Sequence, residues 1–267
     1  MHIVVCVKQV PNPEASFSML KVDEQAKQVV PVAGLQLVMS PFDEQALEAA
    51  LRVRDAGVET KITALCVGPE SARNTLKHAL AMGADEAVLV KDDGLPDGAG
   101  EATAYVLARA VRQLPAADLV LTGRQAADWD AGIVGCGIAE LLGLPVVTLA
   151  RRVDIVDGLA RVERVLPDGF ETIEATLPAV VTVSNELGAA RKPSLRETMR
   201  AARKPLAVRA LPEAGIEPQA LQAIAARRTR ERLYVPVKDT RCEVVEGVDD
   251  AAQAAALVQR LRDARLV

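Results

Sequence analysis

Aromatic side chains are scarce in this sequence of 267 residues, which contains one Trp, two Tyr and three Phe. So few rings are not enough to build, from this chain alone, a platform on which a cofactor ring or a row of bases stacks. Hydrophobic residues nevertheless make up 50% of the chain, which is sufficient for a sizeable core. We therefore expect aliphatic side chains to supply most of the packing.

Other absences narrow the class of protein. The four cysteines are scattered, with no Cys-x-x-Cys pair and no Cys/His cluster, which fits reduced thiols better than disulfides or a zinc site. There is no run of about 18 apolar residues, so we expect no membrane-embedded helix. The start MHIVVCVKQV also lacks the features of a secretory signal. The net charge of -4 argues against a nucleic-acid partner. These absences predict a cytoplasmic protein.

Catalytic side chains are also poorly represented. His2 and His78 are the only candidates for a base near neutral pH. His2 is terminal, and His78 lies on a predicted helix, where a solvated or packed histidine is the commoner case. The motifs GxSxG, HExxH, GxxxxGK[ST] and GxGxxG do not occur. We predict no catalytic residue in this chain.

Strand-like and helix-like segments alternate over the first 185 residues. Short runs rich in Val and Leu predict buried strands, and amphipathic stretches between them predict helices. The predicted strands are 3–8, 62–68, 87–90 and 118–123, and the predicted helices are 41–55, 69–82, 99–113 and 131–143. The alternation predicts an α/β fold with a parallel sheet and right-handed crossovers.

Residues 145–185 have a different pattern. Turn signals at Asp157-Gly158 and Asp168-Gly169 predict hairpin strands at one edge of the sheet, and AVVTV then predicts one more buried strand.

From about residue 186 the alternation stops. The remaining sequence predicts only a short basic helix within 191–205 and a final helix at 249–264. We predict an α/β domain of residues 1–185 and, over 186–267, an extended C-terminal arm that packs on another chain. A disordered linker with a stray helix is the alternative.

The best candidate site is the turn after the strand at 118–123. Ligands of parallel sheets collect beyond the carboxyl ends of the strands, and a glycine-containing helix start offers free N–H groups to a phosphate. Gly132 and Gly135 would permit that approach, whereas Asp128 and Asp130 oppose it unless they point away. An ordinary connection with Asp as the helix cap is an equally good interpretation.

Three further turns are expected at the same edge of the sheet. They follow the first strand (6–9), precede the first long helix (40–42) and follow the second strand (66–68). Together they favour a single nucleotide site. Lys8 could meet a phosphate there, although a surface lysine is the commoner explanation.

Six segments, in order along the whole chain, resemble the beta subunits of electron transfer flavoproteins, the family that includes FixA. The segments are VCVKQVPNP, SPFDEQALEAALRVRD, ALAMGADEAVLV, LTGRQAADWD, VERVLPDGFETIEATLPAVVTV and LRETMRAARKP. The resemblance implies a Rossmann-like, adenine-nucleotide-binding domain whose C-terminal arm wraps an alpha subunit. It also implies that the alpha subunit holds most of a redox-active FAD, while this chain holds AMP with a structural role. The pair would carry electrons from acyl-CoA dehydrogenases or similar flavoenzymes to a quinone-linked oxidoreductase.

The resemblance also assigns residues. The nucleotide site would comprise Val7, Lys8, Ser40, Cys66, Gln125, Asp128, Trp129, Ala131, Gly132, Ile133, Val134 and Gly135. Leu195, with Met199 nearby, would be the apolar anchor that docks a partner flavoenzyme, since central apolar anchors contribute much of an interface's energy. The alternative is a leucine tucked under its own loop.

Three departures from the family pattern concern the nucleotide. Ser40 stands where Asn is usual, and residues 131–134 are apolar where Thr, Asn or Gln is frequent, which leaves backbone N–H groups for a phosphate. Trp129 stands where bifurcating relatives often have a small residue, so its ring would cover the nucleotide or block a second flavin. We favour AMP on these grounds.

Two other functions stay open. One is an electron-bifurcating subunit whose second FAD oxidises NADH. The other is a stand-alone, nucleotide-sensing α/β module, which the long tail disfavours.

Overall fold

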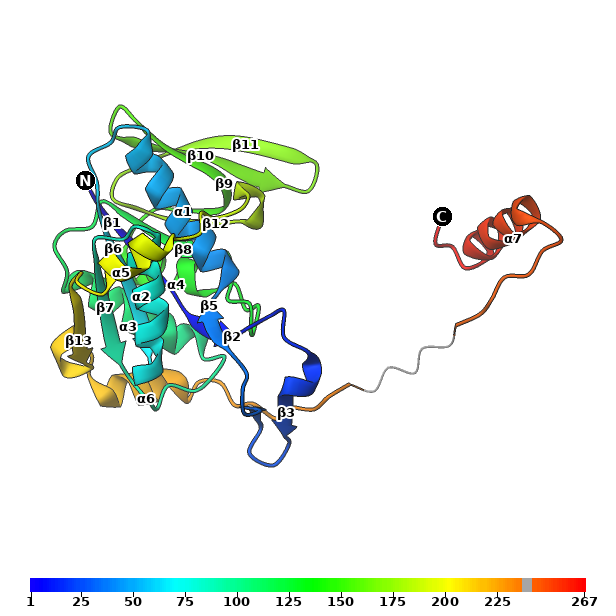
Figure 1. Cartoon of the computed structure of the whole chain (residues 1–267), viewed down its shortest axis with the longest axis horizontal. Helices are drawn as coiled ribbons and strands as arrows, with labels where there is room; N and C mark the ends of the chain where they lie inside the picture. The colour runs from blue at the N-terminus through cyan, green and yellow to red at the C-terminus, as the bar shows by residue number, and fades with distance from the viewer. Residues whose placement is uncertain (237–241) are drawn as a thin grey trace. The chain divides into compact units, whose positions relative to one another are not determined.

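The computed structural model describes residues 1–236 and 242–267 (Figure 1). Contacts divide the chain into two units, Met1–Leu233 and Tyr234–Val267, and each is described here by itself. Residues 237–241, which belong to the predicted arm, lie outside the described residues.

A nine-stranded sheet forms the centre of the first unit, in the order β11-β10-β9-β12-β8-β1-β6-β7-β13. Neighbouring strands from β9 to β13 are parallel, whereas β10 runs antiparallel to β9 and to β11. The strands are β1 His2–Cys6, β6 Lys61–Gly68, β7 Glu86–Lys91, β8 Leu119–Gly123, β9 Val146–Val156, β10 Leu159–Leu166, β11 Gly169–Thr176, β12 Ala179–Val183 and β13 Leu206–Ala210. The predicted α/β fold with a mostly parallel sheet is confirmed.

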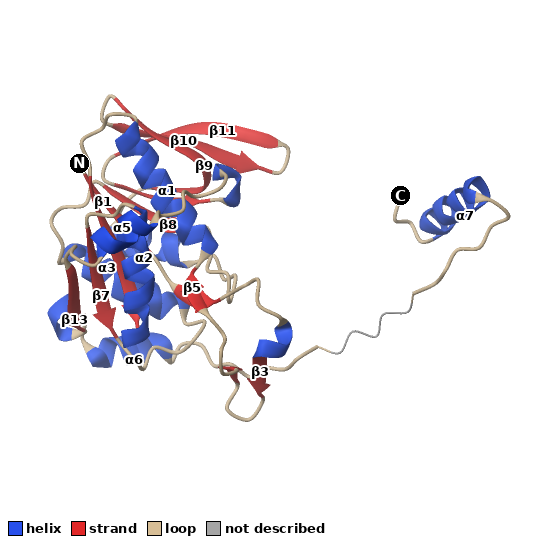
Figure 2. Cartoon of the chain, viewed as in Figure 1, coloured by secondary structure: helices blue, strands red, loops and turns tan. Residues whose placement is uncertain are grey.

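Helices cover both faces of this sheet (Figure 2). One buried cluster joins α1 and α2 to one face, and a second joins α3, α4 and α6 to the other. The helices of the first unit are α1 Pro41–Asp55, α2 Arg73–Met82, α3 Gly100–Arg112, α4 Val134–Leu142, α5 Leu195–Ala201 and α6 Pro218–Ala225. Single turns of 3₁₀ helix lie at η1 Phe17–Met19, η2 Glu70–Ala72, η3 Asn185–Leu187 and η4 Pro212–Ala214.

Two small pairs of strands come between β1 and α1 in the sequence. Strand β2 (Gln9–Pro11) pairs with β5 (Leu37–Met39), and β3 (Leu20–Asp23) pairs with β4 (Gln28–Pro31), both antiparallel.

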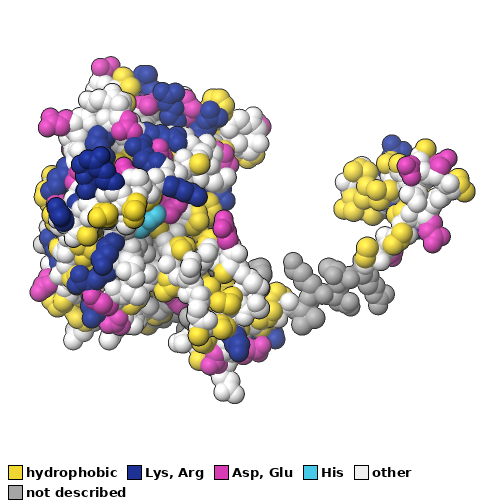
Figure 3. All heavy atoms as spheres, in the orientation of Figure 1, with side chains coloured by type: hydrophobic (Ala, Val, Ile, Leu, Met, Phe, Trp, Pro, Cys, Tyr) yellow, Lys and Arg dark blue, Asp and Glu magenta, His cyan; other side chains and the backbone are white. Residues whose placement is uncertain are grey.

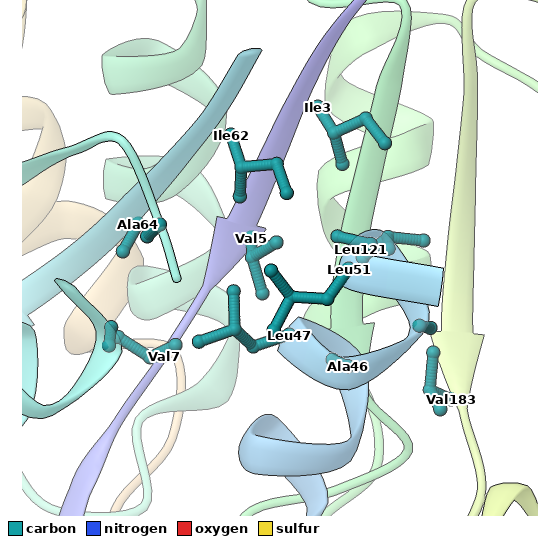
Figure 4. Packing of buried hydrophobic residues seen from close by; sticks show 14 of the residues in the cluster. Ile3, Val5, Val7, Ala46, Leu47, Leu51, Ile62, Ala64, Leu121 and Val183 are labelled. Atoms are coloured by element: carbon teal, nitrogen blue, oxygen red, sulfur yellow. The ribbon is translucent and has the colours of Figure 1, made fainter. Parts of the chain in front are cut away.

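Aliphatic packing forms the core, as expected from the scarcity of aromatic residues. Figure 4 shows Leu47 and Leu51 of α1 against Ile3, Val5 and Ile62 of the sheet, and all five are 0% exposed. Burial of each such side chain contributes about 1.5–3 kcal/mol to stability. The predicted helix at 41–55 coincides with α1, because Ser-Pro-Phe-Asp begins a helix whose apolar residues then recur on one face.

Two expectations differ from the structure. The helix predicted at 131–143 begins only at Val134, because Asp130 and Gly132 have the left-handed φ values of 48° and 67° that a helix cannot contain. The strand–helix alternation was also wrongly expected to stop near residue 186. Strand β13 continues it and pairs in parallel with β7, but it is half-exposed and follows Pro205, so it lacks the buried apolar pattern of the inner strands.

The second unit contains helix α7, Asp250–Asp263, close to the predicted 249–264. The Asp249 carboxylate accepts the N–H of Ala252 at 2.7 Å and caps the helix start. No residue of α7 is buried, and Leu257 and Val258 are 47% and 41% exposed. None of the described helices is long and apolar enough to cross a membrane.

Helix α1 also holds the segment that leads from β12 to α5. Glu48, whose side chain is 7% exposed, accepts hydrogen bonds from the Arg191 side chain at 2.7 and 3.2 Å and from Arg52 Nε at 3.0 Å. Arg52 in turn donates to the carbonyl of Leu187 at 2.9 Å. Burial alone would raise the pKa of Glu48, but the hydrogen bonds from Arg191 and Arg52 outweigh it and hold the pKa below its usual range. The segment before α5 is therefore anchored on a buried carboxylate.

We predict that Glu48→Gln lowers the free energy of unfolding by about 1–3 kcal/mol, because Arg191 loses its charged acceptor while part of its guanidinium stays hydrated. Asp55→Asn is the matched control, since that carboxylate is 55% exposed and binds only the outer Nη2 of Arg191. Its cost should stay under about 1 kcal/mol. Thermal unfolding measures both costs, and hydrogen exchange at residues 185–194 should rise in the first variant alone. Equal costs would show that burial of Glu48 is not what anchors the segment.

Candidate functional site

The strand order reverses at β1. From β1 the chain builds β6 and then β7 on one side, and it later places β8 on the other side of β1. Loops that follow β1 and β8 therefore diverge beyond the carboxyl ends of these strands, and this is the position where open parallel sheets bind ligands. The candidate site, called the crevice below, is the region of the loops 7–9 and 124–133 that follow these two strand ends.

Asp43, in the first turn of α1, joins the two sides of this crevice. Its Oδ2 accepts the N–H of Lys8 at 2.8 Å, and its Oδ1 accepts the N–H of Gly123 at 3.1 Å. A Cβ on Gly123 would lie 2.6 Å from the same Oδ1, so a larger residue would displace the carboxylate. Sequence analysis missed this role, because an acid in a first helical turn is explained by the helix dipole alone.

Burial raises the pKa of Asp43 to about 7, against the lowering effect of the N–H groups of Lys8 and Gly123 and of the Lys8 charge. The side chain is 7% exposed. The link between the two strand ends therefore depends on a carboxyl group that ionises near neutral pH.

Val7 and Cys66 were predicted to contact the nucleotide, and both side chains point into the core. They are 5% and 0% exposed. Burial raises the pKa of the Cys66 thiol to about 12, so it stays protonated and is a poor nucleophile or metal ligand.

Lys8 and Asp128 form an ion pair across the crevice, with Nζ and Oδ2 2.5 Å apart. The other oxygen of Asp128 accepts the N–H of Trp129 at 3.0 Å. Asp130, the second acid of concern, accepts a hydrogen bond from Gln125 at 2.8 Å. The charges of Asp128 and Lys8 therefore compensate each other, whereas Asp130 is hydrogen-bonded only to a neutral amide and keeps its negative charge.

Ser40 connects α1 to the loop 124–133. It is 0% exposed, and its Oγ accepts the N–H of Ala127 at 3.4 Å. Its backbone N–H donates to the carbonyl of Lys8 at 3.0 Å. Ser40 thus holds the loop and the first strand end together.

The loop ends in a row of backbone donors. Among the residues that the structure describes, the N–H groups of Ala131, Gly132 and Ile133 have no protein acceptor. Helix α4 then begins at Val134 without a side-chain cap, so its first N–H groups are also free. These donors and the positive end of the helix dipole favour an anion at this place.

Gly135 lets α4 approach the sheet closely. A Cβ at this position would lie 2.5 Å from Thr182 Cγ2 and 2.7 Å from Thr122 Oγ1. The glycine therefore serves helix–strand packing, while the N–H groups before it remain available.

Arg124 is a charged residue of the site that sequence analysis did not single out. Its guanidinium lies over the Phe42 ring at 5.1 Å from the centroid. Its Nε is buried without a hydrogen-bond partner in the described part of the chain. An unsatisfied cationic donor in this position suits an anionic ligand. The only signal in the sequence was its place directly after a predicted strand.

The predicted docking residues lie on α5, which packs against α2. Leu195 and Met199 are 79% and 69% exposed, so Leu195 is not tucked under its own loop. They border a shallow hollow of about 520 Å³, which is lined by Leu195, Arg196, Met199, Arg200 and Arg203. Figure 3 shows this hydrophobic patch with Lys and Arg side chains around it.

No group of three or more His, Cys, Asp or Glu side chains that could hold a metal ion occurs in residues 1–236 and 242–267.

Residues 29–214 match the electron transfer flavoprotein domain family. Caffeyl-CoA reductase-Etf complex subunit CarD of Acetobacterium woodii is 34% identical over 267 residues, which cover 100% of both chains. The electron transfer flavoprotein subunit beta of Megasphaera elsdenii is 40% identical over 210 residues, 76% of each chain. Protein FixA of Azorhizobium caulinodans is 35% identical over 272 residues, 98% of this chain and 94% of the relative.

The raised pKa of Asp43 predicts a pH dependence of stability. Between about pH 4 and pH 7 the folded chain holds a proton on Asp43 that the unfolded chain has lost, so this group lowers the free energy of unfolding as pH rises, by up to about 1.4 kcal/mol per unit. Asp43→Asn should remove this slope and, because its NH₂ group would face one of the two backbone N–H donors, should reduce stability by about 1–3 kcal/mol at low pH. Thermal unfolding from pH 5 to pH 8 measures both effects.

The control for this prediction is Asp93→Asn. It removes a carboxylate that is 69% exposed, and the slope should stay unchanged. Identical slopes in the wild type and Asp43→Asn would contradict the assignment of the proton to Asp43.

Proposed function

The chain belongs to the beta-subunit family of electron transfer flavoproteins, and we propose that its crevice binds AMP as a structural ligand. Beta subunits of this family pair with alpha subunits and carry electrons rather than catalyse a reaction. In our proposal the alpha subunit holds most of a FAD, which supplies the redox chemistry when bound. The electrons come from an acyl-CoA dehydrogenase or similar flavoenzyme and pass to a quinone-linked oxidoreductase, in the cytoplasm.

The row of free N–H groups from Ala131 to the start of α4 is the observation that carries the nucleotide proposal. A phosphate there would meet backbone donors and a helix N-terminus, which need no polar side chain. Asp128 would not repel it strongly, since its charge is paired with Lys8, and Asp130 is the remaining uncompensated acid of the loop. The unsatisfied Nε of Arg124 is a further donor at the same end of the sheet.

The size of Trp129 favours a mononucleotide. Its half-buried ring lies close to Gly98, where an added Cβ would be 3.3 Å away, and beneath the guanidinium of Arg230. A second flavin dinucleotide would have to share the loop with this ring or displace it. AMP is the smaller ligand and suits the phosphate donors equally well.

The second candidate is an electron-bifurcating subunit with a second FAD that oxidises NADH. The similarity over the full length of both chains to a subunit of a caffeyl-CoA reductase-Etf complex supports keeping it. The two candidates differ in the number of flavins, so one measurement separates them.

Two surfaces of the chain suit protein partners. The apolar pair Leu195 and Met199, surrounded by arginines, suits a flavoenzyme with an acidic rim around an apolar pocket. Helix α7 exposes Leu257 and Val258 and buries none of its residues, which suits an arm that packs on an alpha subunit.

We predict that the purified heterodimer releases one FAD and one AMP when it is denatured. Separation and quantitation of the released nucleotides by liquid chromatography tests this. Two FAD without AMP would support the bifurcating candidate instead. A heterodimer that contains FAD but neither retains nor rebinds any nucleotide in the beta subunit would overturn the proposed site.

We also predict that Leu195→Ala raises the KM for the donor flavoenzyme by about tenfold, because truncation of a central apolar anchor typically costs more than 1 kcal/mol. FAD and AMP content should not change, because α5 is separate from the crevice. Leu37→Ala is the control, since Leu37 is also exposed, at 43%, but lies on β5. Steady-state electron transfer with purified dehydrogenases measures KM, and equal values for all three proteins would remove the docking assignment.

A further inference from the structure

Arg230 brings together three loops that are distant in sequence. It follows α6, in the stretch 228–233 that contains neither helix nor strand and ends the first unit. Its guanidinium lies 4.4 Å from the centroid of the Trp129 ring. Its Nη1 donates to the carbonyl of Lys27 at 2.5 Å, and its Nη2 donates to the carbonyl of Asp97. The arginine is therefore held from three directions.

The Trp129 ring also has a shaped neighbour on the loop 96–98. Gly98 has a φ of 74°, and a Cβ at this position would lie 3.3 Å from Trp129 Cδ2. A side chain at Gly98 would press on the indole and would strain the backbone. The ring therefore lies close to Gly98 on one side and under Arg230 on another, so contacts outside its own loop help to hold it.

Trp129 lies in the loop 124–133, between the two features of that loop that would affect a bound nucleotide. The residue before it, Asp128, pairs with Lys8 across the crevice, and the residues after it supply the free N–H groups of Ala131–Ile133. Movement of the indole would therefore carry both the ion pair and the phosphate donors with it. An arginine stacked on the ring attracts its π face and so helps to hold it in place.

We infer that Arg230 is a positioning residue that keeps the Trp129 loop closed over the nucleotide, so that the stretch 228–233 acts as a strap that slows nucleotide exchange. This rests on the proposed nucleotide site. The strap adds no contact to the reacting groups. It acts through Trp129, and its effect is on the rate at which nucleotide leaves.

The neighbouring Arg228 provides a matched control. It lies on the same stretch, and its Nη2 pairs with Glu101 Oε1 at 2.9 Å in the first turn of α3. Arg228→Ala removes an anchor of the strap without touching Trp129. If Arg230 only fastened the chain to the first unit, both substitutions would have similar effects.

The test uses the purified heterodimer loaded with radiolabelled AMP and chased with excess unlabelled AMP. Arg230→Ala should speed the loss of label at least tenfold, and Arg228→Ala should leave it within twofold of the wild type. Hydrogen exchange at residues 128–133 should increase in Arg230→Ala only. Arg230→Lys keeps the charge but cannot reach both carbonyls and the ring, so it should give an intermediate rate, and it serves as the variant of choice if the alanine protein does not fold.

The outcomes separate the two proposals. A wild type that binds AMP and exchanges it at the same rate as the Arg230 variants would overturn the strap and leave the nucleotide site intact. Equal acceleration by Arg228→Ala and Arg230→Ala would also overturn it, since the effect would not pass through Trp129. A wild-type heterodimer that binds no AMP would overturn the proposed site, and the strap's role with it.

Discussion

The carboxylate of Asp43 joins three elements at the point where the sheet changes direction. It lies in the first turn of α1 and accepts one N–H from the end of β1 and one from the end of β8. Two strand ends that diverge at a switch point would otherwise leave these backbone donors to solvent or to a ligand. With the carboxylate in place, the loops on both sides of the crevice start from fixed positions. Burial raises the pKa of Asp43 to about 7, so this fixed arrangement includes a group poised to ionise near neutral pH.

Helix α1 also holds a second part of the chain in place, the segment before α5. Its N-terminus holds the crevice through Asp43 and Ser40, and its outer face holds the segment before α5 through the buried Glu48 and its arginine partners. The core side of the same helix is packed without exposure against the sheet. Helix α1 therefore helps to position both the crevice and the surface of α5, although these two bind different partners in our proposal.

Local sequence patterns predicted the inner strands and the bounds of α1. Buried aliphatic runs and helix starts depend only on residues that are close together in the sequence. The expectation of a site at the strand ends followed from the predicted parallel topology. Strand β13 was missed because an edge strand beside a proline lacks a buried pattern. The roles of Asp43, Glu48 and Arg230 could not be predicted, since each depends on partners 35 or more positions away that only the folded chain brings near. The late start of α4 depended on left-handed backbone at Asp130, which its residue type permits but does not require.

The central claim is that the loops after β1 and β8, together with the start of α1, form one adenine-nucleotide site. Hydrogen exchange of the nucleotide-stripped heterodimer, measured with and without added AMP, tests it most directly. The account predicts slowed exchange at residues 7–9, 40–43 and 124–136, with β10 and β11 unchanged. Slowed exchange confined to other parts of the chain, or none at saturating AMP, would contradict it.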